Sequence, residues 1–136
     1  RDVERSRGLG DVYKRQIRVH GPGERAGNLS GGNQQKIILA REIGDSPDLL
    51  IAMQPTRGLD IGASSYVRTC MQNLRDRGKG VLLISTDLDE IMQVSDRIAV
   101  MYEGKIMGIV ENSAELKAET LGLMMGGRPV EEVIAE

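Results

Sequence analysis

Two short apolar runs, residues 49–52 and 81–84, constrain the fold of this 136-residue chain more than any other feature. Between them, residues 63–77 carry apolar side chains at helical spacing and end at Gly78. A strand, a helix and a second strand in this order form a βαβ unit with a parallel strand pair. Uninterrupted apolar runs are typical of strands that are covered on both faces. The sequence therefore predicts an α/β fold in which the helix faces a mainly parallel sheet through Val67, Cys70, Met71 and Leu74.

Further elements are expected on both sides of this unit. A helix over residues 31–43 should end at Gly44, because Pro47 prevents its continuation. A hairpin with its turn at Glu103-Gly104 should form an antiparallel edge of the same sheet. The other expected segments are a short helix around Leu88, Ile91 and Met92, a helix over residues 114–125, and a loose acidic tail over residues 128–136.

The octet Leu29-Ser30-Gly31-Gly32-Asn33-Gln34-Gln35-Lys36 stands directly before the apolar part of the first helix. Ser30 is a good N-cap residue, and the two glycines carry no side chain that could screen the backbone. The first N–H groups of a helix have no partner within it and lie at the positive end of its dipole. This start is therefore a candidate phosphate site, in which Ser30 would add a hydroxyl to the backbone donors.

The octet resembles the signature motif of ABC-transporter ATPases, and in particular that of bacterial importers of simple sugars and nucleosides. The resemblance continues through residues 47–60, 81–90 and 95–100 and covers roughly residues 17–127. It implies an ATP-dependent protein with the P-loop NTPase fold that uses Mg²⁺. In this family, two nucleotide-binding halves are fused in tandem, and each ATP lies between the P-loop of one half and the signature of the other.

The chain has no P-loop. That motif needs a lysine followed by Ser or Thr, and none of the five lysines has such a neighbour. Because the P-loop precedes the signature in the family, residues 17–127 resemble the C-terminal part of the second nucleotide-binding domain. Residues 11–16 match the translation of a transposon end used in sequencing libraries. We therefore expect residues 1–16 to be an adapter-derived segment, with a native basic arm as the alternative.

Three positions depart from the family's pattern. Met53 and Gln54 stand where the family has the Asp that helps to hold Mg²⁺ and the catalytic Glu, and Thr86 stands where it has a histidine that contacts the γ-phosphate. A thioether cannot replace a carboxylate as a ligand of this hard ion. A glutamine amide cannot take up a proton at accessible pH. We expect no intact catalytic residue and no metal site here, and the isolated chain should be inactive.

The resemblance implies that this half donates its signature to ATP held mainly by the partner half. The residues in question are Leu29, Ser30, Gly31, Gly32, Asn33 and Gln34. Gly58, Leu59 and Asp60 would lie at the interface between the halves, although Asp60 is also placed to cap the helix that follows. The implied partners are the other half and transmembrane permease subunits, at the cytoplasmic face of the cell membrane.

Composition excludes several other classes of protein. The formal net charge of −2 does not fit a nucleic-acid-binding surface, and no apolar run approaches the ~20 residues of a membrane span. Cys70 is the single cysteine and is expected to be a packed thiol, and His20 an ordinary surface histidine. The alternative function is a non-catalytic docking or regulatory domain related to ABC ATPases. A third possibility is a fragment without a function of its own.

Overall fold

The computed structural model describes residues 25–44 and 47–135, which form two compact units. The first unit ends at Ile84 and the second begins at Ser85. Residues 1–16 and His20 lie outside the described residues, so the expectations for them stay predictions. None of the described helices is long and apolar enough to cross a membrane.

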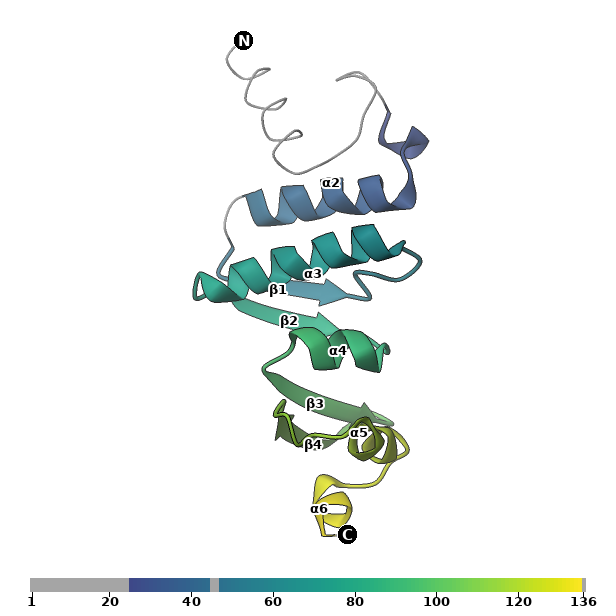
Figure 1. Ribbon diagram of the computed structural model, residues 1–136, viewed down its shortest axis with the longest axis vertical. Coiled ribbons are helices and arrows are strands. Elements are labelled where there is room, and N and C mark those ends of the chain that lie inside the picture. Colours follow the sequence, from purple (N-terminus) through teal and green to yellow (C-terminus); the bar gives the residue numbers. More distant parts are fainter. Residues whose placement is uncertain (1–24, 45–46, 136) are drawn as a thin grey trace. The chain divides into compact units, whose positions relative to one another are not determined.

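The first unit contains the predicted βαβ arrangement (Figure 1). Strand β1 (Leu49–Met53), helix α3 (Ile61–Asp76) and strand β2 (Gly80–Ile84) follow one another. The strands pair in parallel, from Leu49 opposite Gly80 to Met53 opposite Ile84. Helix α2 (Gly31–Gly44), preceded by the 3₁₀ turn η1 (Ala26–Asn28), packs beside α3. Gly78 follows α3 at φ +78°, a conformation that favours glycine, so the predicted end of this helix is confirmed.

The apolar runs suit strands that are covered on both faces, but the described chain does not cover both faces of β1 and β2. Along β1, buried Leu50 and Ala52 alternate with exposed Leu49, Ile51 and Met53. Leu82 and Ile84 of β2 are also exposed. An uninterrupted apolar run indicates that both faces are suited to burial, whereas the actual burial depends on what covers each face. Helix α3 packs on this sheet, and five large apolar side chains remain exposed on the two strands.

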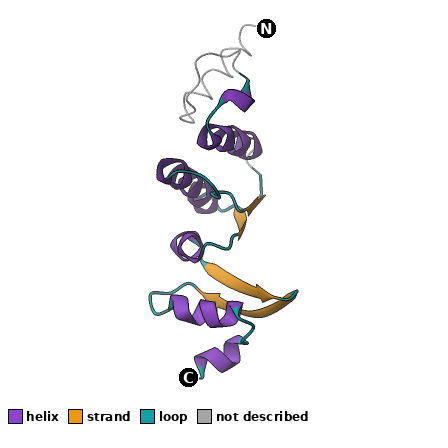
Figure 2. Ribbon diagram, turned by 90° about the vertical axis from the view of Figure 1, so that its right-hand side faces the viewer, coloured by secondary structure: helices purple, strands orange, loops and turns teal. Residues whose placement is uncertain are grey.

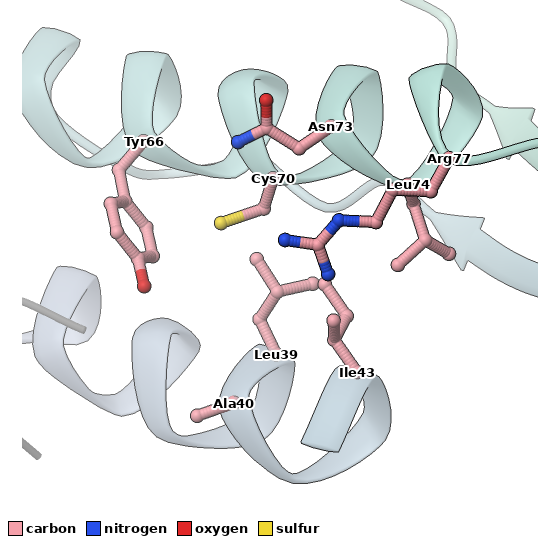
Figure 3. A pocket seen from close by; sticks show the side chains of 8 residues that line it. All are labelled: Leu39, Ala40, Ile43, Tyr66, Cys70, Asn73, Leu74 and Arg77. Carbon is pink, nitrogen blue, oxygen red and sulfur yellow. The ribbon is translucent and has the colours of Figure 1, made fainter. Parts of the chain in front are cut away.

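Cys70 differs from the three residues with which it was grouped. Val67, Met71 and Leu74 are buried, but Cys70 is half-buried and points into a pocket of about 100 Å³ between α2 and α3 (Figure 3). Leu39, Ala40 and Ile43 of α2 line the same pocket, and so does the buried Leu74 of α3. The prediction that Cys70 faces the sheet was therefore wrong. Because α3 contacts both α2 and the sheet, it has two apolar faces instead of one.

The second unit begins with helix α4 (Leu88–Val94), which the sequence predicted. Strands β3 (Arg97–Tyr102) and β4 (Lys105–Glu111) form the predicted hairpin, with Glu103 at φ 45° and Gly104 at φ 78° in its turn. Two positive φ values in succession match the twist of a two-residue hairpin. The hairpin forms a two-stranded sheet of its own and does not extend the β1–β2 sheet.

Two predictions about the end of the chain were wrong. Helix α5 begins at Ala118 instead of residue 114, because Lys117 is extended and a turn joins Ser113 to Leu116. The supposedly loose tail contains helix α6 (Val130–Ile134). Val130 and Val133 pack against the core formed by Ile98, Val100, Leu121 and Met124. Apolar contacts therefore hold this segment in place, although its acidic composition suggested a loose tail.

Helices α5 and α6 lie against the β3–β4 hairpin (Figure 2), and Gly108 of β4 allows them to approach closely. A Cβ atom at Gly108 would lie 2.5 Å from the Cβ of Val130 and 2.9 Å from the methyl of Met124. These distances are far below ordinary van der Waals contact. Asn112 adds a polar connection, because its amide donates to the carbonyl oxygens of Met92 at 2.8 Å and Ser95 at 2.7 Å. Its side chain thus ties the end of α4 to the end of β4.

We predict opposite effects for two Gly→Ala substitutions in the second unit. Gly108→Ala should lower the free energy of unfolding by about 1–3 kcal/mol, because the added methyl overpacks the contact with α6. Gly122→Ala should raise it by about 0.5–1 kcal/mol, since alanine favours the helix and nothing lies within 4 Å of the added methyl. Urea unfolding followed by circular dichroism measures both changes. Equal midpoints for the two variants would contradict the tight fit at Gly108.

Candidate functional site

The start of helix α2 is arranged as an N-capped turn. The Ser30 hydroxyl oxygen accepts a long hydrogen bond of 3.4 Å from the N–H of Asn33, which confirms Ser30 as the cap. The Ser30 carbonyl accepts the N–H of Gln34 at 2.9 Å, and the Gln34 side-chain amide donates to the Leu29 carbonyl at 2.8 Å. By helix geometry, the N–H groups of Gly31 and Gly32 have no partner within the helix. These hydrogen bonds hold the turn in place, and two backbone donors remain at the N-terminal end of the helix.

The two glycines of this turn have different surroundings. A Cβ atom at Gly31 would have nothing within 4 Å, so a ligand can approach its backbone. A Cβ at Gly32 would lie 2.8 Å from the Cβ of Ala63 and 3.7 Å from the Asp60 Oδ2 atom. Sequence reasoning gave both glycines the same role of exposing the backbone. In the structure, Gly32 also allows α2 to approach α3 closely.

The loop before α3 holds the predicted interface residues Gly58, Leu59 and Asp60. It is compact, because the N–H of Arg57 donates to the Gln54 carbonyl and the N–H of Leu59 donates to the Thr56 carbonyl. Asp60 accepts the N–H of Ala63 on its Oδ1 atom at 2.8 Å. Asp60 is therefore the N-cap of α3, which was the structural alternative considered for it. Its role between two halves stays a prediction.

The starts of α2 and α3 together form one surface. The Gly32–Ala63 contact joins them, and the Asp60 carboxylate lies beside the contact. One helical turn further along, the Lys36 ammonium lies 5.0 Å from the centroid of the Tyr66 ring. This distance fits a cation–π interaction. Tyr66 had no distinguishing signal in the sequence, because its role depends on which face of α3 meets α2.

Met53 and Gln54, which we expect to replace the family's acidic residues, follow each other at the carboxyl end of β1. Met53 is the last residue of the strand, and it is 70% exposed. Gln54 has φ 47°, and its N–H donates to the Ile84 carbonyl at 2.7 Å. Thr86, the third replaced position, lies two residues after Ile84 along the chain and is exposed. A left-handed conformation at a residue other than glycine is uncommon, and sequence reasoning did not predict it.

The chemistry of this edge does not fit a bound Mg²⁺ ion. An exposed thioether and a neutral amide stand at the two positions where hard oxygen ligands and a proton acceptor would be needed. Within residues 25–44 and 47–135, no group of three His, Cys, Asp or Glu side chains is placed to hold a metal ion. The α2 start, in contrast, has the open backbone approach at Gly31 that a phosphate oxygen requires.

Comparison with known proteins gives several similar sequences. A nucleoside import ATP-binding protein of Lactococcus lactis is 57% identical over 111 residues, which are 80% of this chain and 22% of the relative. A guanosine import ATP-binding protein of Bacillus subtilis is 50% identical over 131 residues, 90% of this chain and 26% of the relative. A ribose import ATP-binding protein of Lacticaseibacillus paracasei is 46% identical over 111 residues, 82% of this chain and 22% of the relative. The chain thus spans about a quarter of their length. No family model matches it.

Solved structures with a similar fold are ABC transporter cassettes. A dimeric bacterial cassette matches with a TM-score of 0.69 at 22% identity, over 83% of this chain and 49% of that one. A cassette in its ADP conformation matches with a TM-score of 0.65 at 21% identity, over 93% of this chain and 47% of that one. The predicted fold of an ABC ATPase is confirmed by these matches, which cover about half of each cassette.

The left-handed conformation of Gln54 leads to a prediction about stability. Gln54→Val should lower the free energy of unfolding by about 1–2 kcal/mol, because a β-branched side chain tolerates positive φ poorly. Gln54→Gly is the matched control and should show no loss, since glycine adopts this conformation readily. Midpoints of urea unfolding compare the two variants. If Val is tolerated as well as Gly, the backbone at this position is not held left-handed.

Proposed function

The chain belongs to the ABC-type ATP-binding cassettes, and from this membership we propose that it is the C-terminal part of the second nucleotide-binding half of an ABC importer ATPase. Its relatives are named for the import of nucleosides, guanosine and ribose. The proposed cargo is accordingly a nucleoside or a simple sugar. In this proposal the segment from Leu29 to Lys36 contributes to an ATP site whose P-loop belongs to the partner half.

The observation that carries the proposal is the capped and open start of α2. Ser30 caps the first turn, and a ligand can approach the backbone at Gly31. Preorganised N–H donors at a helix start stabilise the negative charge of a phosphate without any rearrangement. We assign the contacts with the γ-phosphate to Leu29, Ser30, Gly31, Gly32, Asn33 and Gln34. ATP supplies the phosphoryl group when it is bound, and this chain's own residues orient it and offset its charge.

The second part of the proposal is that this half does not hydrolyse ATP at its own site. Met53 offers no ligand for Mg²⁺, and Gln54 cannot accept a proton from an attacking water. Thr86 has no ring nitrogen to contact a γ-phosphate. The isolated chain, which also has no P-loop, should therefore be inactive, while the intact protein hydrolyses ATP at the site that the signature completes.

Closure of two halves around ATP would be the mechanical step of transport. The proposed partners are the second nucleotide-binding half of the same polypeptide and transmembrane permease subunits, which would place the protein at the cytoplasmic face of the membrane. Gly58, Leu59 and Asp60 are proposed to lie at the interface between the halves. Of the three, Asp60 lies beside the α2 start, since its Oδ2 atom is 3.7 Å from a Cβ built at Gly32.

A docking or regulatory domain without ATPase activity is the competing function, and the three replaced residues favour it. The upstream reading frame distinguishes the two. We expect it to encode a P-loop in each half, with an Asp-Glu pair at the end of the corresponding strand in the first half. A complete protein without any P-loop would instead establish the docking function.

In the intact protein, we predict unequal effects of substitutions at the signature and at the replaced site. Ser30→Arg and Gly31→Asp should each lower ATPase turnover at least about 100-fold, because they place bulk or a negative charge where a phosphate is stabilised. Gln54→Ala should cost less than about threefold, since no proton transfer is available to lose there. Phosphate release by the purified protein measures all three. If Gln54→Ala lowers turnover as much as Ser30→Arg, this half hydrolyses ATP at its own site.

A further inference from the structure

We propose that Gly32 and Ala63 form a positioning contact that sets where the backbone donors of Gly31 and Gly32 lie. The contact joins the starts of α2 and α3. The proposal rests on the proposed function, because those donors matter only if they act on a phosphate. Ala63 does not touch the nucleotide, whereas Gly32 has both a backbone donor and this packing contact. Their part is to hold the α2 start at a fixed distance from the Asp60-capped start of α3.

The contact leaves no room for an additional methyl group. A Cβ built at Gly32 lies 2.8 Å from the Cβ of Ala63, whereas carbon atoms in favourable contact are about 3.5–4.0 Å apart. Ala63 is 5% exposed and has no flexible side chain that could turn away. Its N–H is held by the Asp60 Oδ1 atom at 2.8 Å, so it cannot retreat without breaking the N-cap of α3. A methyl at Gly32 must therefore displace α2.

The rest of the α2–α3 interface is less constrained. One helical turn further along, the ammonium of the flexible Lys36 lies 5.0 Å from the centroid of the Tyr66 ring. Beyond it, the helices leave a pocket of about 100 Å³ lined by Leu39, Ile43 and Cys70, among others (Figure 3). The long side chain and the empty space can absorb small shifts. Ala63 has no side chain that could shift in this way, so we assign the spacing of the helix starts to the Gly32–Ala63 contact.

The displacement caused by a methyl at Gly32 would be about 1 Å, the difference between the built distance and normal contact. A misplacement of that size in a catalytic arrangement can cost about 100-fold in rate. We therefore expect Gly32→Ala to lower turnover in the intact protein by about 10- to 100-fold. KM for ATP should change much less, because the P-loop that holds the nucleotide belongs to the other half.

The test is a methyl swap across the contact in the intact protein. Gly32→Ala, Ala63→Gly and the double variant are assayed for kcat and KM at a temperature where circular dichroism shows each to be fully folded. The double variant restores the original number of methyl groups at the contact. We expect its kcat to exceed that of Gly32→Ala by at least about fivefold, although it carries an additional helix glycine. The matched control is Gly32→Ala with Ser65→Gly, at an exposed position of the same helix, and it should give no rescue.

Three outcomes would overturn the proposal. They are unimpaired turnover in Gly32→Ala, a double variant no more active than Gly32→Ala, and equal rescue by Ser65→Gly. The Gly31→Asp variant, assayed in parallel, separates this failure from that of the proposed function. If Gly31→Asp abolishes turnover while the swap fails, the signature acts on ATP but Ala63 does not position it. If Gly31→Asp is fully active, the proposed function fails, and the positioning role fails with it.

Discussion

The parallel pairing of β1 with β2 is the constraint on which the first unit depends. Parallel neighbours cannot be joined by a tight turn, so the chain must cross over the sheet before the second strand begins. Helix α3 makes that crossover. The burial of Val67, Met71 and Leu74 decides which face of the helix packs inward. Because α3 is fixed in this way, its N-terminal cap at Asp60 is fixed as well. Helix α2 then packs beside α3, with the two helix starts in contact at Gly32 and Ala63.

Most of the elements could be predicted, because their signals are local. The apolar runs that became β1 and β2, Gly78 after α3 and Glu103-Gly104 in the hairpin all act through neighbours in the sequence. The same holds for Ser30, whose hydroxyl caps the turn that it begins. Family resemblance added the assignment of the signature and of the replaced positions. The sequence matches support the family, while the function of each site residue remains proposed.

The features that could not be predicted depend on contacts between distant segments. Cys70 fits an apolar stripe on α3, and only the position of α2 shows that it faces a second partner. Helix α6 follows from the space that Gly108 leaves for Val130, across more than twenty residues of chain. The left-handed backbone of Gln54 arises where a strand end must turn while keeping its bond to Ile84. Gly32 was assigned to ligand access alone, although it is also a packing residue.

The position of the Asp60 carboxylate has a consequence for the strength of any anion site at the α2 start. One oxygen caps α3, and the other lies beside Gly32, near the positive end of the α2 dipole. A fixed negative charge there stabilises the helix but repels an incoming anion. If the α2 start acts as proposed, Asp60 would weaken its attraction for a lone phosphate. A helix start with this weaker attraction would hold an anion only while other groups bind it as well. The anion would dissociate when those groups separate from it.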